Sequence, residues 1–155
     1  MFAKLKQILT QQDEKSHENS ANNQQRQADL AAVALMIAVS NADHQVDQRE
    51  VDSILKIASE TIKLSDEDVQ TFFNEAERQA DASISYYEFT DVINRVYGKA
   101  KRFGLIENMW RVAYADGELD KYEDSTIRKV AELLYVSHAN FIKAKHIVST
   151  DLNQT

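Results

Sequence analysis

Two acidic segments contain the side chains whose types and spacing suggest chemistry. Segments 42–50 and 115–123 share one pattern: Ala-Asp, two residues, an aliphatic residue, a second Asp and, three residues further on, Glu. Carboxylate oxygens are preferred ligands of calcium and magnesium. If the fold brings the two segments together, their carboxylates could be pooled into a site for a divalent cation. The candidate ligands are Asp43, Asp47, Glu50, Asp116, Glu118, Asp120 and Glu123.

The second segment resembles the later part of an EF-hand calcium loop, but the match is incomplete. Asp116 and Gly117 fall where such a loop has a carboxylate and its turn glycine. The earlier ligand positions fall on Val112 and Tyr114, which have no carboxylate, and Val39 fails in the same way in the first segment. Neither segment is therefore an EF-hand, although a weaker ion site remains an alternative.

Helix capping explains part of the repeated pattern without any ligand. Asp47 and Asp120 are predicted N-caps, and Glu50 and Glu123 then stand at the third helical position, from which a Glu side chain can reach back to the cap amide. Each capping arrangement contributes on the order of 1 kcal/mol. The Asp of each Ala-Asp pair and the extra acid at position 118 are left unexplained, so any function of the repeat should be sought there.

The sequence has no recognisable catalytic constellation. His44 lies beside Asp43, but it shares no ligand spacing with His17, His138 or His146, so we interpret it as an exposed loop residue. There is no Gly-rich phosphate loop, no His-Glu-x-x-His motif and no supported Ser-His-Asp grouping. We therefore expect a protein without enzymatic activity.

The amino-acid composition and the lengths of the apolar stretches indicate the cellular compartment of the protein. The chain of 155 residues has no cysteine, which excludes disulfides, thiol catalysis and Cys-ligated metals and fits a reducing environment. The N-terminus lacks the continuous apolar stretch of a secretory signal. The most apolar run, residues 30–39, is about half the length needed to cross a bilayer. We expect a cytoplasmic protein without stable membrane insertion.

The distribution of charge indicates the class of partner. The net charge is −7, and residues 31–80 contain four basic residues against ten acidic ones. An acidic protein repels the phosphate backbone, so nucleic-acid binding would depend on one basic cluster. That cluster consists of Arg95, Lys99, Lys101, Arg102 and Arg111. We expect no nucleic-acid partner, and another protein is the more plausible one.

Helical periodicity predicts an all-α fold. The chain has no proline and three glycines, and its apolar residues recur only at helical spacing. Segments 29–42 and 105–113 are apolar on nearly every face, as central helices are, and each leads into an acidic segment followed by an amphipathic helix. An offset of 116 − 43 = 73 residues relates the two copies. We predict a single compact bundle of about seven helices, built from two related helix-loop-helix halves.

The remaining elements complete the predicted layout. Ser65, Ser85 and Ser137 are expected to open three further helices. The helix after Ser85 is expected to carry the basic cluster at its C-terminal end, with a break at Gly104 before the second apolar helix. We place a short amphipathic helix and a polar linker, or polar helix extension, at 1–28, the helical domain at 29–148 and a polar tail at 149–155. The first helix would dock on the body or on a second copy of the chain, which leaves a homodimer as an option.

At these residues the sequence resembles the TerB family of tellurite resistance proteins, which is also related to the N-terminal domain of the membrane-anchored co-chaperone DjlA. The resemblance rests on the two acidic segments and on residues 105–120 leading into 127–131, and it covers roughly 29–148. The first copy departs from the family pattern because His44 stands where the family has glycine, which puts an ion role for that copy in doubt.

The resemblance implies a helical bundle in the bacterial cytoplasm, no enzymatic activity and a link to stress response or tellurite resistance. We therefore expect a non-catalytic stress-response domain that acts as a protein-interaction module through an acidic surface. The alternative is a divalent metal ion-binding or ion-sensing module that uses the paired Asp/Glu segments, with calcium or magnesium as the ion.

Overall fold

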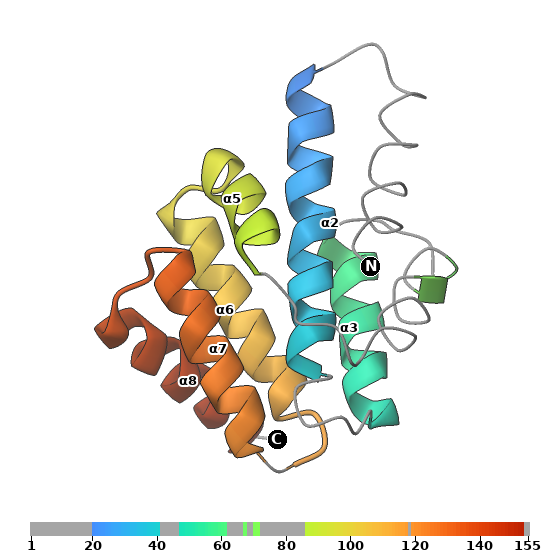
Figure 1. Cartoon of the computed structure of the whole chain (residues 1–155). Coiled ribbons are helices and arrows are strands. Elements are labelled where there is room, and N and C mark those ends of the chain that lie inside the picture. The colour runs from blue at the N-terminus through green and yellow to red at the C-terminus, as the bar shows by residue number, and fades with distance from the viewer. Residues whose placement is uncertain are drawn as a thin grey trace.

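The computed structural model describes residues 20–40, 47–61, 67, 70, 71, 86–117 and 119–153. This part of the chain is helical and contains no strand, which confirms the all-α prediction (Figure 1). The helices whose bounds are established are α2 (Ser20–Ser40), α3 (Gln48–Thr61), α5 (Tyr87–Val96), α6 (Lys99–Ala113), α7 (Lys121–Leu133) and α8 (His138–Asn153).

Helices α2 and α6 form the centre of the bundle, as their apolar sequences predict. Helix α2 contacts α3, α5, α6 and α7, and α6 also contacts α3, α7 and α8. Every residue from Leu30 to Ile37 is buried, and so are Met109, Trp110 and Val112 of α6. Alanines at three positions of that run in α2 let neighbouring helices approach closely. Each half of the duplication therefore contributes one central helix.

Each of the outer helices α3, α5, α7 and α8 buries one stripe, and the first three are strongly amphipathic. Ile54 and Ala58 of α3 are buried, and Ile127 and Ala131 are their counterparts in α7. The stripes of α5 and α8 are Phe89 and Ile93, and Phe141, Ala144 and Val148. The helix expected after Ser65 lies mostly outside the described residues, although Glu67, Gln70 and Thr71 are helical.

The break expected at Gly104 is wrong. Gly104 lies inside α6, and the chain turns at Tyr97 and Gly98, which have extended backbones with ψ of 129° and 178°. A glycine within a helix costs about 1 kcal/mol relative to alanine, and the apolar packing on both sides of Gly104 outweighs that cost. Lys99, Lys101 and Arg102 consequently occupy the first turn of α6, and not the C-terminal end of the preceding helix.

The helix ends refine the predicted boundaries. Helix α2 begins at Ser20, so this part of the polar stretch before residue 29 is a helix extension, and α8 continues into the polar tail as far as Asn153. Residues 2–9 and the cap at Ser85 lie outside the described residues. In the part of the chain that the structure describes, no helix is both long and apolar enough to span a bilayer.

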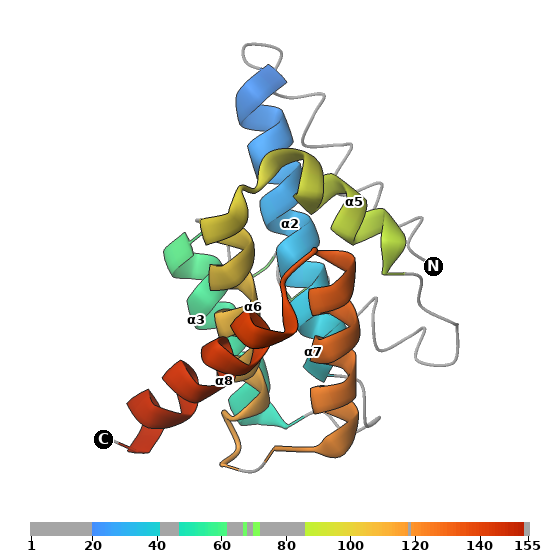
Figure 2. The same cartoon turned by 90° about the vertical axis from the view of Figure 1, so that its left-hand side faces the viewer.

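In each half, the end of the central helix and the start of the helix that follows it lie at one end of the bundle (Figures 1 and 2). Helices α2 and α6 finish at this end, and α3 and α7 start there, in both views of the molecule (Figures 1 and 2). The fold therefore places at the same end of the bundle the two helix starts, Gln48 and Lys121, that lie within the acidic segments.

Candidate functional site

The candidate site is this end of the bundle, which we call the acidic end. It contains Asp47 and Glu50 at the start of α3, and Asp116, Asp120 and Glu123 in and after the connection from α6 to α7. The other two predicted site residues, Asp43 and Glu118, lie outside the described residues.

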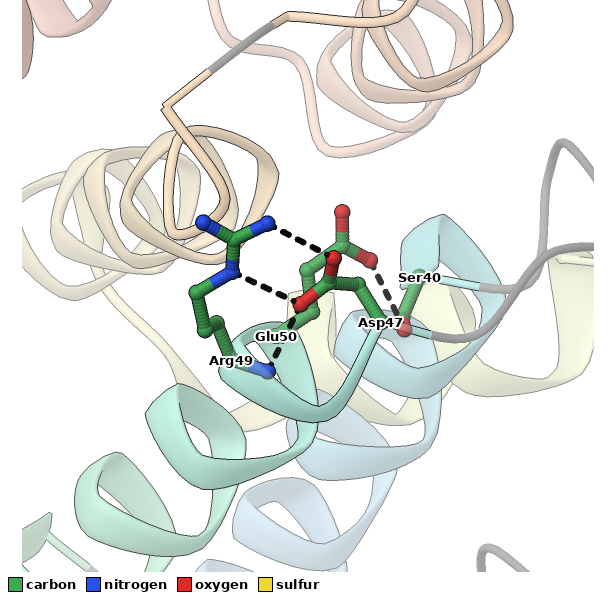
Figure 3. A network of polar contacts seen from close by, with 4 residues as sticks. All are labelled: Ser40, Asp47, Arg49 and Glu50. Atoms are coloured by element: carbon green, nitrogen blue, oxygen red, sulfur yellow. Dashed lines mark hydrogen bonds and ion pairs between the residues drawn. The ribbon is translucent and has the colours of Figure 1, made fainter.

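Asp47 is the N-cap of α3, as predicted. Its Oδ1 accepts a hydrogen bond of 2.8 Å from the Arg49 backbone N–H. The Arg49 guanidinium also binds this carboxylate, with Nε 3.1 Å from Oδ1 and Nη2 3.0 Å from Oδ2 (Figure 3). The pKa of Asp47 is lowered from its ordinary value of 3.8. The main cause is the hydrogen bonding of the Arg49 side chain, and the second is the hydrogen bond from the Arg49 backbone N–H. A cation that used Asp47 would have to displace Arg49.

Glu50 joins α3 to α2 through a buried bond that we did not predict. Its side chain is almost fully buried, and its Oε2 accepts a hydrogen bond of 3.1 Å from the hydroxyl of Ser40, the last residue of α2 (Figure 3). Because a buried carboxylate is stable only when it is hydrogen-bonded or paired, this contact is part of what holds the two helices at the acidic end.

The second half repeats the N-cap with a different turn before it. Asp120 has an extended backbone, and its Oδ1 accepts a hydrogen bond of 2.6 Å from the Tyr122 backbone N–H. Gly117 has a φ of +86°, a conformation that glycine adopts without steric cost, and its N–H donates to the Tyr114 carbonyl. The glycine that resembles an EF-hand position thus has a structural reason to be there.

The burial of both N3 glutamates is the feature that sequence reasoning missed. Glu50 and Glu123 are 2% and 1% exposed, and their reach-back to the cap amides stays a prediction. Each stands four residues before the first isoleucine of its buried stripe, Ile54 or Ile127. Residues four apart share a helix face, so extending the stripe by one turn would have predicted this burial.

The structure does not bring the described candidate ligands into an ion-binding cluster. Among residues 20–40, 47–61, 67, 70, 71, 86–117 and 119–153, no group of three or more His, Asp or Glu side chains is arranged to hold a metal. Because Asp43 and Glu118 lie outside that set, the pooled site for calcium or magnesium stays a prediction.

A groove of about 410 Å³ lies between α2, α3 and α6, away from the acidic segments. Met36, Ile57 and Leu105 contribute apolar walls. The Tyr97 hydroxyl donates to the Asp29 carboxylate, and burial, followed by this bond, raises the pKa of Tyr97 well above its ordinary value. Sequence reasoning could not find this groove because its residues come from three separated segments.

The all-helical bundle with two related halves agrees with the resemblance to the TerB family that the sequence indicated. A comparison with protein families matches residues 29–146 to the family described as tellurite resistance protein TerB. The chain belongs to the TerB family. The TerB match starts within α2 and ends within α8, so it contains both acidic segments, the whole of α6 and the part of α2 from residue 29 onward. No curated protein and no solved structure matches the chain.

Proposed function

We propose that this TerB-family protein is a non-catalytic interaction module that binds a basic segment of another protein at the acidic end. The observation that supports the proposal is the placement of both acidic helix starts at one end of the bundle (Figure 1). The family description supports a role in tellurite resistance. A bacterial stress response and a cytoplasmic location are further parts of the proposal.

The acidic end offers carboxylates and one aromatic ring to a partner. Asp116 and Asp120 are partly exposed, and Tyr122, which directly follows the start of α7, is 54% exposed. Isolated surface ion pairs are worth about 0–1 kcal/mol, so a stable complex needs several of them together with an apolar contact. Tyr122 can supply that contact, because tyrosine rings pack well at interfaces. A partner arginine would also compete with Arg49 for Asp47.

The proposal is tested by capturing partners from an extract of the native host with two matched variants. Asp116→Asn with Asp120→Asn removes two charges from the acidic end, and asparagine retains the N-cap at position 120. Asp91→Asn with Glu132→Gln removes the same charge from exposed positions on α5 and α7. We expect the first variant to lose the partners that the wild type and the second variant retain. Equal capture by both variants would contradict the proposal.

The second candidate function is binding of calcium or magnesium by the carboxylates of the acidic end. It is favoured by the left-handed Gly117 directly after Asp116, since EF-hand loops place glycine at that position to turn the chain. Titrating either ion while following the backbone amides tests this candidate. We expect saturable shifts of the backbone amides around Asp116 that are absent in the Asp116→Asn variant. If millimolar calcium or magnesium produces no localised shift, the ion-binding candidate is wrong.

A further inference from the structure

The start of α6 and the end of α7 lie at the opposite end of these helices from the acidic end (Figure 1), and a second polar site lies there. It is a pocket of about 270 Å³ where the first turn of α6 meets the connection between α7 and α8. Its charged and polar lining comes from Lys99, Arg102, Tyr135, Ser137 and Asn140, and none of the lining side chains is acidic.

The electrostatics of this pocket are the reverse of those at the acidic end. Helices α3 and α7 have acidic residues in their first turns, where the helix dipole favours them, but α6 and α8 have none. The first turn of α6 contains Lys99, Lys101 and Arg102 instead. These cations add to the positive end of the helix dipole, an arrangement that disfavours folding unless an anion offsets it. Of these cations, Lys99 and Arg102 line the pocket, whereas Lys101 lines the groove with Asp29 and Tyr97. The pocket therefore has two cationic side chains in its lining in a protein whose net charge is −7.

Arg102 is held in place at the pocket wall. Its Nη1 donates a hydrogen bond of 2.9 Å to the Leu134 carbonyl. Its Nε is buried and has no hydrogen-bond partner among the described residues. Across the pocket, the Asn140 backbone N–H donates to the hydroxyl of Ser137, the residue before α8, at 3.2 Å. Lys143 of α8 adds a further cation, with Nζ 6.0 Å from the ring centroid of Phe103 in the lining.

Tyr135 at the rim has no evident structural reason to be tyrosine. The Val136 N–H bonds to the Ala131 carbonyl and the Tyr135 N–H to the Glu132 carbonyl, which is the Schellman pattern at the end of α7. This pattern places Tyr135 at the position that glycine usually occupies, with a φ of +58°. The ring is 80% exposed and contributes nothing to the core. A strained, exposed aromatic residue beside a cationic pocket suggests a ligand contact.

We propose that this pocket binds the phosphate group of a small phosphorylated metabolite. Lys99 and Arg102 pair with the phosphate oxygens, because guanidinium and ammonium groups are the usual phosphate ligands of proteins. The starts of α6 and α8 add the favourable end of two helix dipoles. The ring of Tyr135 packs against the organic part of the ligand. The site is independent of the acidic end and of the function proposed for it.

The test is a titration of the full chain with inorganic phosphate, and separately with adenosine monophosphate, at constant ionic strength and followed by backbone amide shifts. We expect saturating shifts at Lys99, Arg102 and Asn140 with both compounds, and tighter binding of the nucleotide. Lys99→Ala should weaken binding about tenfold, since one charge-assisted hydrogen bond is lost. Lys99 is exposed, so this variant should keep its fold, and Lys129→Ala, an exposed lysine on α7, is the matched control.

Four results would overturn the proposal. The first is the absence of saturable shifts, and the second is an equal loss of binding in Lys99→Ala and Lys129→Ala. The third is adenosine monophosphate binding no more tightly than inorganic phosphate. The fourth is binding to vesicles containing phosphatidylglycerol but to neither of the two soluble compounds. The last result would show that the positive charge of the pocket binds a membrane surface and not a soluble phosphate compound. Tyr135→Gly should remove the gain for the nucleotide and leave the affinity for inorganic phosphate unchanged.

Discussion

The buried bond between Ser40 and Glu50 makes the sharpest prediction about the fold. The Ser40 hydroxyl lies 3.1 Å from Glu50 Oε2, and both residues are at most 2% exposed. Replacing Ser40 with alanine removes the hydroxyl donor, and the Glu50 carboxylate then stays buried without this hydrogen bond. A hydrogen bond to a charged group contributes about 1.5–3 kcal/mol, and the better helix propensity of alanine returns up to about 0.5 kcal/mol.

We therefore expect Ser40→Ala to lower the free energy of unfolding by about 2 kcal/mol. For a chain of this size that corresponds to a fall in melting temperature of about 4–8 °C. Urea denaturation followed by circular dichroism gives the free energy, and thermal unfolding gives the temperature. Ser125→Ala, the same change at an exposed position on α7, is the control and should stay within about 0.5 kcal/mol of wild type.

A double-mutant cycle with Glu50→Gln isolates the pair. If the bond is the cause, the effect of Ser40→Ala should shrink clearly in the Glu50→Gln background, because a neutral acceptor forms a weaker bond. The reasoning is refuted if Ser40→Ala is no more destabilising than Ser125→Ala, or if its effect is the same in both backgrounds.

Three further predictions concern single side chains. Tyr135→Gly should be more stable than Tyr135→Ala by about 1 kcal/mol in urea denaturation, since only glycine relieves the left-handed strain; equal stability would contradict the Schellman assignment. Asp120→Ala should lose about 1 kcal/mol and Asp120→Asn almost nothing, because asparagine also caps; equal losses would argue against the N-cap. Arg49→Gln should raise the pKa of Asp47 toward 3.8 in a carboxyl NMR titration, and an unchanged pKa would argue against the pair. Since folding lowers this pKa, Asp47 contributes stability above its unfolded pKa that is lost as pH falls through the folded one, and Arg49→Gln should weaken this acid dependence.

The features that local pattern determines could be predicted from the sequence. The stripes of α3 and α7, the central positions of α2 and α6, and the N-caps at Asp47 and Asp120 all follow from helical spacing and capping chemistry. Gly104 misled the prediction, because a glycine signals a helix end only when packing does not compensate for its low helix propensity. The true break at Tyr97 and Gly98 also contains a glycine, so residue type alone does not distinguish it from Gly104.

The contacts of the site could be predicted only in part. The Ser40–Glu50 bond depends on where α2 ends relative to α3, and the groove with Asp29 and Tyr97 depends on which helices are neighbours. Neither is encoded in local spacing. The burial of Glu123 is accessible from its position four residues before Ile127, whereas the capping pattern predicts only where its carboxylate could bond.

The central claim is that the acidic end binds a basic segment of another protein. The measurement that tests it most directly is the dissociation constant of a captured partner for the variant Asp116→Asn with Asp120→Asn, relative to wild type. Loss of two charge-assisted contacts predicts binding weakened about tenfold or more, with a smaller loss at high salt where these contacts are already screened. A dissociation constant unchanged in this variant would contradict the claim.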